Sequence, residues 1–135
     1  MSHFRPVYLD TSALTKLIVR EAESRALFDW LGDWPDQFTS VLARVEIVRM
    51  LKRGRAPAAV LFNAETVLAR VDSIHLDAPV LAAASTLKDP LLRTLDALHL
   101  ACALSIGDAP EAFVTYDTRL ARAAERMKLA VVSPR

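Results

Sequence analysis

Short strand-like runs that alternate with longer stretches of helical spacing dominate this sequence. The runs cover residues 6–9, 37–40, 73–76, 112–115 and 129–132, of which 6–9 is apolar and 73–76 alternates between polar and apolar residues. Between them, apolar residues recur at helical intervals, as in the segments 41–53, 95–106 and 118–127. This alternation predicts an α/β fold with three layers, in which helices cover both faces of a central, mainly parallel sheet of four to five short strands.

The length and composition of the chain predict a single domain over residues 1–135. Hydrophobic residues make up 53% of the chain, which is enough to bury a core and excludes disorder for most of its length. Lys and Arg total 17 against 16 Asp and Glu, so binding of nucleic acid through bulk positive charge is excluded. Any contact with RNA or DNA has to use local patches or a bound cation. The single cysteine, Cys102, excludes an internal disulfide and a four-cysteine zinc site.

No segment is typical of secretion or of a membrane span. Residues 1–6 contain no long apolar stretch, and the nearly apolar segment 97–106 is too short to cross a bilayer. We therefore expect a cytoplasmic protein without membrane contact.

Several polar residues are suited to begin helices. The hydroxyls of Thr11 and Ser12 follow the first apolar run, and Thr94 precedes the segment 95–106. Asp77 precedes a segment with Pro79 in its first turn. We expect these residues to cap three of the helices.

Four carboxylates fall where a parallel α/β sheet would form its site. Asp10 and Asp117 come at or just after the ends of two predicted strands, Asp96 lies in the first turn of a helix, and Glu46 lies inside another helix among apolar neighbours. Ligands of such sheets bind outside the carboxyl ends of the strands. Converging carboxylates repel one another, and a hard cation such as Mg²⁺ relieves that repulsion. One ion, or two, held by such a cluster suits displacement at phosphorus.

Each of these acids also has an ordinary structural interpretation. Asp10 fits a turn or a helix cap, Asp117 an N-cap, and Asp96 a charge that favours the helix dipole. Glu46 is spaced to pair with Arg49 or Arg53 on its own helix. The spacing of the residues leaves both interpretations open.

Four segments resemble the motifs of a known family, the PIN-domain nucleases, and occur in the order of that family. They read LDTSAL at residues 9–14, TSVLARVE at 39–46, LRTLDALHLA at 92–101 and VTYDTRL at 114–120. The third and fourth are the more specific, and residues 51–90 contribute little. In length and motif style the chain is most similar to VapC, the toxin of bacterial VapBC toxin–antitoxin pairs.

The resemblance implies a PIN fold and an endoribonuclease that depends on Mg²⁺, with Mn²⁺ as a substitute. It implies that Asp10, Glu46, Asp96 and Asp117 are the catalytic and metal-binding residues, with Asp10 and Asp96 as the main direct ligands. Hydrolysis by a metal-activated water leaves a 5′-phosphate and a 3′-hydroxyl. The resemblance also implies inhibition by a small VapB-type antitoxin and a toxin homodimer.

Other residues near these motifs are candidates for supporting roles. Ser12 and Thr115 can hydrogen-bond ligands or a phosphate, and Arg93 and Arg119 can contact phosphate. The arginine stripe that Arg119 opens continues, at helical spacing, with Arg122 and Arg126.

His99 lies three residues after Asp96 on the same predicted helix. A general-base role is conceivable, but its apolar neighbours favour a buried structural histidine. The first two helices are rich in apolar and aromatic residues, and any exposed part of them would form a groove for an antitoxin helix.

Three other functions stay open. One is a PIN nuclease of RNA processing or repair that has no antitoxin. Another is a receiver-like signalling module that is phosphorylated on an aspartate, and the third is a catalytically idle binding partner. The sequence does not name an RNA target, because groove shape and loops would set the specificity.

Overall fold

Five strands and seven helices follow one another along residues 4–135, the part of the chain that the computed structural model describes. The first three residues, and with them part of the segment behind the expectation of no secretion signal, lie outside this part. The strands are β1 (Val7–Leu9), β2 (Gln37–Ser40), β3 (Asp72–Ile74), β4 (Ala112–Val114) and β5 (Val131–Val132). The helices are α1 (Thr11–Ile18), α2 (Ser24–Leu31), α3 (Val41–Arg53), α4 (Ala58–Ala69), α5 (Ala78–Ser85), α6 (Thr94–Leu104) and α7 (Thr118–Arg126).

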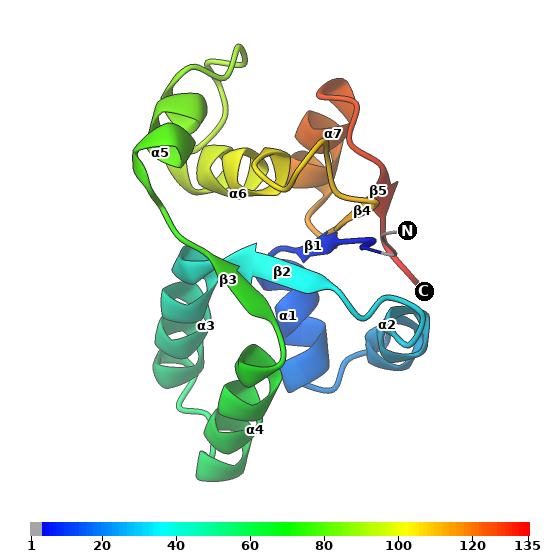
Figure 1. The fold of residues 1–135 in the computed structure, drawn as a ribbon. Helices are drawn as coiled ribbons and strands as arrows, with labels where there is room; N and C mark the ends of the chain where they lie inside the picture. Colours follow the sequence, from blue (N-terminus) through cyan, green and yellow to red (C-terminus); the bar gives the residue numbers. More distant parts are fainter. Residues whose placement is uncertain (1–3) are drawn as a thin grey trace.

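All strand pairs of the sheet are parallel, and the strand order is β3-β2-β1-β4-β5 (Figure 1). From the central β1 the chain builds outward through β2 to β3, and it then crosses to the other side of β1 to add β4 and β5. The order therefore reverses between β1 and β4, which is where parallel α/β sheets bind their ligands. In a parallel sheet the carboxyl ends of all strands share one edge.

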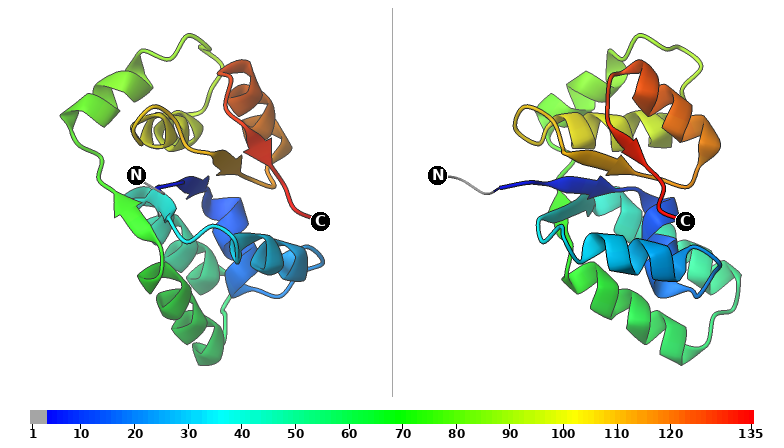
Figure 2. Two further views of the ribbon diagram at one scale, coloured as in Figure 1. Left: turned by 45° about the vertical axis from the view of Figure 1, so that its right-hand side comes forward. Right: turned by 90° about the vertical axis from the view of Figure 1, so that its right-hand side faces the viewer.

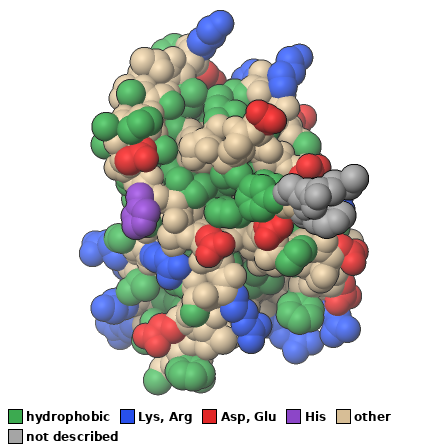
Figure 3. Space-filling model, viewed as in Figure 1, with side chains coloured by type: hydrophobic (Ala, Val, Ile, Leu, Met, Phe, Trp, Pro, Cys, Tyr) green, Lys and Arg blue, Asp and Glu red, His purple; other side chains and the backbone are tan. Residues whose placement is uncertain are grey.

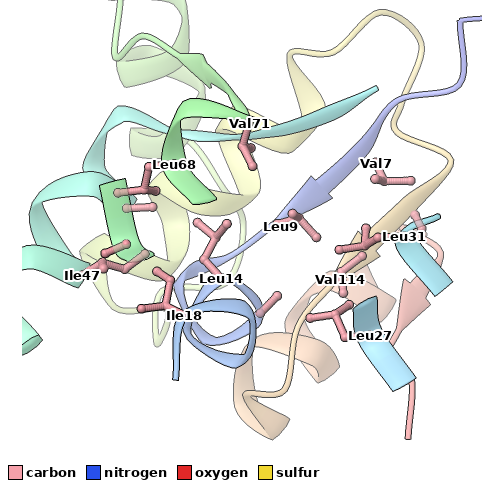
Figure 4. Packing of buried hydrophobic residues seen from close by; sticks show 14 of the residues in the cluster. Val7, Leu9, Leu14, Ile18, Leu27, Leu31, Ile47, Leu68, Val71 and Val114 are labelled. Atoms are coloured by element: carbon pink, nitrogen blue, oxygen red, sulfur yellow. The ribbon is translucent and has the colours of Figure 1, made fainter. Parts of the chain in front are cut away.

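Helices cover both faces of the sheet, so the predicted three-layer α/β fold is confirmed (Figure 2). Side chains alternate along each strand. Val7, Leu9 and Val114 point to the face covered by α1 to α4, where they join the core cluster of Figure 4. Tyr8 and Phe113 point to the opposite face and pack with residues of α5, α6 and α7. The odd and even positions of one strand thus serve two separate cores.

Two of the predicted helix caps are wrong. Helix α1 is capped by Asp10, whose Oδ1 accepts a hydrogen bond from Ala13 N at 2.9 Å, and not by the hydroxyls that follow it. Helix α6 starts at Thr94 itself, after Arg93, which makes no side-chain cap. The chain leaves β1 at Asp10, one residue before Thr11, so Asp10 and not a hydroxyl stands at the cap position of α1. The prediction for Asp77 is confirmed, since its side chain caps α5.

On the face shown in Figure 3, charged side chains stand in small groups. Lys and Arg side chains lie in separate groups there and form no continuous band. This distribution agrees with the small net charge of the chain. Within residues 4–135, no helix is both long and apolar enough to cross a membrane.

Candidate active site

Asp10 leaves the carboxyl end of β1 and is almost sealed from solvent, with 2% of its surface exposed. Its Oδ1 accepts hydrogen bonds from Ser12 Oγ at 2.7 Å and Ala13 N at 2.9 Å, and its Oδ2 accepts one from Thr115 Oγ1 at 2.6 Å. Burial raises the pKa of Asp10, and the hydrogen bonds oppose that rise without cancelling it. The side chain is thus a buried carboxyl held in one orientation.

The two hydroxyls that hold Asp10 also tie the end of β1 to the loop after β4. Ser12 Oγ accepts a hydrogen bond from Tyr116 N at 2.8 Å, and Thr115 Oγ1 accepts one from Asp117 N at 3.0 Å. The predicted supporting role of Ser12 and Thr115 near an acid therefore has a geometric basis. Their direct contact is with Asp10, while contact with a ligand stays a prediction.

Asp117 and Asp96 lie near each other at the same edge. Asp117 caps α7, with its Oδ1 accepting hydrogen bonds from Arg119 N and Leu120 N. Burial and then repulsion from Asp117 raise the pKa of Asp96, in the first turn of α6. The structural interpretation of Asp117 as an N-cap is confirmed, and it does not conflict with a role in the site because the cap faces the sheet edge.

Glu46 reaches the same region from the second turn of α3. Its Oε1 accepts hydrogen bonds from Thr11 Oγ1 at 2.8 Å and faces His99 Nε2 at 2.9 Å, and its side chain is 24% exposed. Burial alone would raise the pKa of Glu46, but these hydrogen bonds outweigh it and the pKa is lowered. Pairing with Arg49 or Arg53 is not among the contacts of the described residues.

His99 links the acids, which the sequence did not predict. The residue is buried, as expected, with 3% of its surface exposed, but it is surrounded by polar groups as well as apolar ones. Its Nδ1 lies 2.7 Å from the Tyr8 hydroxyl, and its Nε2 faces Glu46. It also lies close enough to Asp10 and Asp96 to affect their charge.

Tyr8 and Thr11 were also missed as site neighbours. In the sequence, only the three-residue spacing of Asp96 and His99 indicated that His99 lies near the site. The partners of His99 come from β1, α1 and α3, which are distant in the sequence.

The cations of the site rim are Arg93 and Arg119. Both are exposed, and both lie close enough to Asp96 to favour its charged form. The predicted arginine stripe is shorter than the sequence suggests, because Arg126 pairs with Asp89 at 2.9 Å. Arg93 and Arg119 are thus the arginines placed to meet an anion that approaches the acids.

The chemistry of the four carboxylates fits a hard divalent cation, since all the donors are oxygens and two of the acids repel each other. Within residues 4–135, however, no three His, Cys, Asp or Glu side chains are grouped so that they could hold a metal ion as they stand. Mg²⁺ often uses only one or two carboxylates and keeps several waters. The acids therefore line one edge without forming a closed cage.

The sequence and the fold have known relatives. Residues 7–126 match the PIN domain family. The chain is 48% identical over 132 residues to Ribonuclease VapC35 of Mycobacterium tuberculosis (strain ATCC 25618 / H37Rv), a match that covers 95% of this chain and 96% of that protein. It is 40% identical to Ribonuclease VapC47 of Mycobacterium tuberculosis (strain CDC 1551 / Oshkosh), with the same coverage.

Two solved structures share the fold at low sequence identity. The crystal structure of Mycobacterium tuberculosis VapC20, described as a toxin that cleaves the sarcin–ricin loop, superposes with a TM-score of 0.72 at 20% identity and covers 95% of this chain and 99% of its own. VapBC2 from Rickettsia felis, bound to a DNA fragment from its promoter, also gives a TM-score of 0.72, at 14% identity, and covers 96% and 99%.

The parallel sheet with acids at the reversal of its strand order, together with the match over residues 7–126, defines a PIN-domain protein. Within that class, the chain belongs to the VapC toxin family, since it is 48% identical to a VapC ribonuclease over nearly the full length of both chains.

Proposed function

We propose that the protein is a Mg²⁺-dependent endoribonuclease and the toxin of a VapBC-type pair. The observation that carries the proposal is the pair of carboxylates Asp10 and Glu46 at the edge where the strand order reverses: Ser12 and Thr115 hold Asp10, and Thr11 and His99 hold Glu46. Membership of the VapC family supports the same function. The residue roles and the metal dependence below belong to this proposal.

Asp10 and Asp96 would hold the ion directly, with Glu46 and Asp117 completing the site through waters. When bound, the ion makes a water more acidic and neutralises the charge that develops on the phosphodiester. Mn²⁺ can replace Mg²⁺ because both accept oxygen ligands. Hydrolysis by water leaves a 5′-phosphate and a 3′-hydroxyl.

The remaining residues of the edge would hold this arrangement in place. Ser12 and Thr115 fix the Asp10 carboxylate through both of its oxygens, so that it does not have to reorient when a ligand arrives. Asp117 is fixed by the backbone of α7. Because these partners are rigid, the site is ordered by the fold before substrate binds.

The central experiment is cleavage of a structured RNA with added Mg²⁺, before and after EDTA. We expect EDTA to abolish cleavage, excess Mg²⁺ to restore it, and Asp96→Asn to reduce its rate by roughly 100-fold or more, because the variant loses one charge of the site. The matched control is Asp33→Asn, an exposed aspartate outside the site, which should cleave normally. Cleavage that persists in EDTA and in Asp10→Asn would contradict the mechanism.

Arg93 and Arg119 would bind the phosphates of the RNA that flank the scissile bond. Both lie beside Asp96, so the anion they attract arrives next to the acids. We predict that Arg119→Gln weakens RNA binding and reduces the slope of log affinity against log salt by about 0.7, the value for one single-strand phosphate contact. Arg122→Gln, an exposed change on the same helix, is the control and should leave the slope unchanged. Equal slopes for the wild type and Arg119→Gln would remove Arg119 from the interface.

The antitoxin would bind the groove between α2 and α4. This hollow of ≈ 540 Å³ is lined by apolar residues that include Leu17, Phe28 and Val67. Phe28 is 64% exposed, which is unusual for a large aromatic side chain. An amphipathic helix of a VapB-type antitoxin would cover it. Trp30 and Trp34 pack against the core, so Phe28 is the aromatic side chain that lines the groove.

The other functions considered from the sequence have less support. A PIN nuclease of RNA processing would share the site, but membership of the VapC family favours a toxin. Neither the family nor the buried, fully hydrogen-bonded Asp10 supports a receiver-like module or an idle partner. Homodimerisation and cytoplasmic location stay predictions.

A further inference from the structure

A buried chain of polar side chains joins four elements behind the acids. The Tyr8 hydroxyl on β1 lies 2.7 Å from His99 Nδ1 on α6, and His99 Nε2 lies 2.9 Å from Glu46 Oε1 on α3. Thr11 on α1 donates to the same Oε1 at 2.8 Å. Tyr8 is fully buried and stacks on Phe113, with ring centroids 5.3 Å apart. The inner end of the chain therefore cannot move without disturbing the core.

The hydrogen atoms of this chain can be assigned by counting donors and acceptors. The groups in front of His99 Nε2 are the Glu46 carboxylate and the oxygen of Thr11, whose own hydrogen goes to Glu46. Both are acceptors, so Nε2 carries a hydrogen. Nδ1 faces the Tyr8 hydroxyl, which can donate or accept.

These contacts leave one side of Glu46 free for a ligand. Both hydrogen bonds end on Oε1, and among the described residues none reaches Oε2. The side chain is partly exposed, and the oxygen that these contacts fix is Oε1. A carboxylate anchored through one oxygen is oriented in advance for a ligand on the other.

We infer that His99 is the positioning residue of the acidic site: its Nε2–H holds Glu46 Oε1, and the Tyr8 hydroxyl orients the ring through Nδ1. The inference rests on the proposed function, because it needs Glu46 to reach the ion, through water, from Oε2. His99 itself touches neither metal nor RNA. Its effect passes through Glu46.

The first test reads the hydrogen on Nε2 without any metal. Long-range ¹H–¹⁵N correlation spectra of the metal-free full chain should show a hydrogen on Nε2 of His99. Tyr8→Phe removes only the hydroxyl and should change the ring ¹⁵N shifts of His99, because the contact to Nδ1 is lost. Tyr116→Phe is the matched control, since it removes a hydroxyl that binds Pro134 O and should leave the spectrum of His99 unchanged. An Nε2 without a hydrogen in the wild type would overturn the inference.

The second test measures Mn²⁺ affinity by calorimetry for variants whose fold is checked by circular dichroism. We expect His99→Leu to weaken binding about tenfold or more, the loss typical when the hydrogen-bond partner of a ligand is removed. His99→Gln should recover most of the affinity, because its amide can donate to Glu46. Tyr8→Phe should weaken binding less than His99→Leu. Leu100→Ala, a buried change on the same helix, should not alter affinity.

The outcomes separate the inference from the function. Wild-type affinity in both His99→Leu and Tyr8→Phe would overturn the positioning role, whatever the RNA assay shows. A wild-type protein that binds Mn²⁺ with the expected variant pattern but leaves RNA intact would overturn the ribonuclease proposal alone. A wild-type protein that binds no Mn²⁺ would overturn both.

Discussion

Asp10 has two roles with opposite requirements for its environment. As the N-cap of α1 it accepts a hydrogen bond from the backbone, and as the metal ligand proposed above it would have to be ionised. Its burial disfavours the ionised form, so the pKa is raised despite three hydrogen bonds. A buried carboxylate with a raised pKa lowers the free energy of unfolding at neutral pH. Such a cost in stability is common for functional groups.

The loss of stability caused by burying Asp10 should appear in the pH dependence of the free energy of unfolding. Because the pKa of Asp10 is higher in the folded chain than in the unfolded chain, its contribution favours folding at low pH and is lost as the pH rises through the raised value. We predict that Asp10→Asn, measured by urea unfolding in EDTA, lacks this loss. The variant should gain stability relative to the wild type as the pH rises above about 4, the pKa of an aspartate in the unfolded chain.

The exposed Asp33→Asn change is the control for general charge effects and should follow the wild-type curve. A difference between Asp10→Asn and the wild type that stays constant with pH would mean that Asp10 has the same pKa in both states. The prediction would then be wrong.

At the scale of elements, the helix starts arrange the site. Helices α1, α3 and α7 begin where β1, β2 and β4 end, and their caps are Asp10, Ser40 and Asp117. Helix N-termini carry partial positive charge, which favours acids placed there. The same short turns that start the helices thus bring carboxylates to the edge of the sheet.

Arg44 connects α3 to the α4–β3 corner and so fixes the element that carries Glu46. Its guanidinium donates to Ser73 Oγ at 2.6 Å and to the carbonyl oxygens of Leu68 and Val71 at 2.8 and 3.2 Å. We predict that Arg44→Met lowers the free energy of unfolding by about 2 kcal/mol, because partly buried carbonyls lose their donors. Chemical denaturation with an unchanged m-value would measure this loss.

Arg53→Met tests the same chemical change at an exposed position of α3 and should alter stability by less than about 0.5 kcal/mol. Equal effects at both positions would show that the contacts of Arg44 contribute nothing.

At the scale of the whole molecule, the acids and the apolar groove lie in different places. The acids line the carboxyl edge of the sheet, whereas the groove is built from α1, α2, α4, the start of β2 and the turn before β3. We therefore expect that changes in the groove weaken partner binding without affecting RNA cleavage.

We predict that Phe28→Asp weakens binding of the VapB-type antitoxin by at least about tenfold, the effect of removing an aromatic anchor. Isothermal titration with the antitoxin would measure it. RNA cleavage by the free variant should be unchanged, because Phe28 lies outside the acidic edge. Phe62→Asp changes an equally exposed phenylalanine of α4 that does not line the groove, and it should bind normally. If both variants bind the antitoxin as well as the wild type, this groove is not the docking site.

The sequence by itself determined the layers of the fold and the strand and helix order, and it named the acids that are candidates for the site. These follow from apolar periodicity and from short motifs, both of which act over a few neighbouring residues. The sequence also indicated where helices start, but it misplaced the caps of α1 and α6, because a cap depends on where the backbone leaves the sheet.

Only the tertiary structure decided what each acid touches. Thr115 and Asp10 are 105 residues apart along the chain, and His99 and Glu46 are 53 apart. Hydrogen bonds between such distant residues form only when the parallel sheet and its helices bring several elements to one edge. The sequence therefore predicts that His99 is a buried residue among apolar neighbours. The folded structure shows that it also links Tyr8 and Glu46.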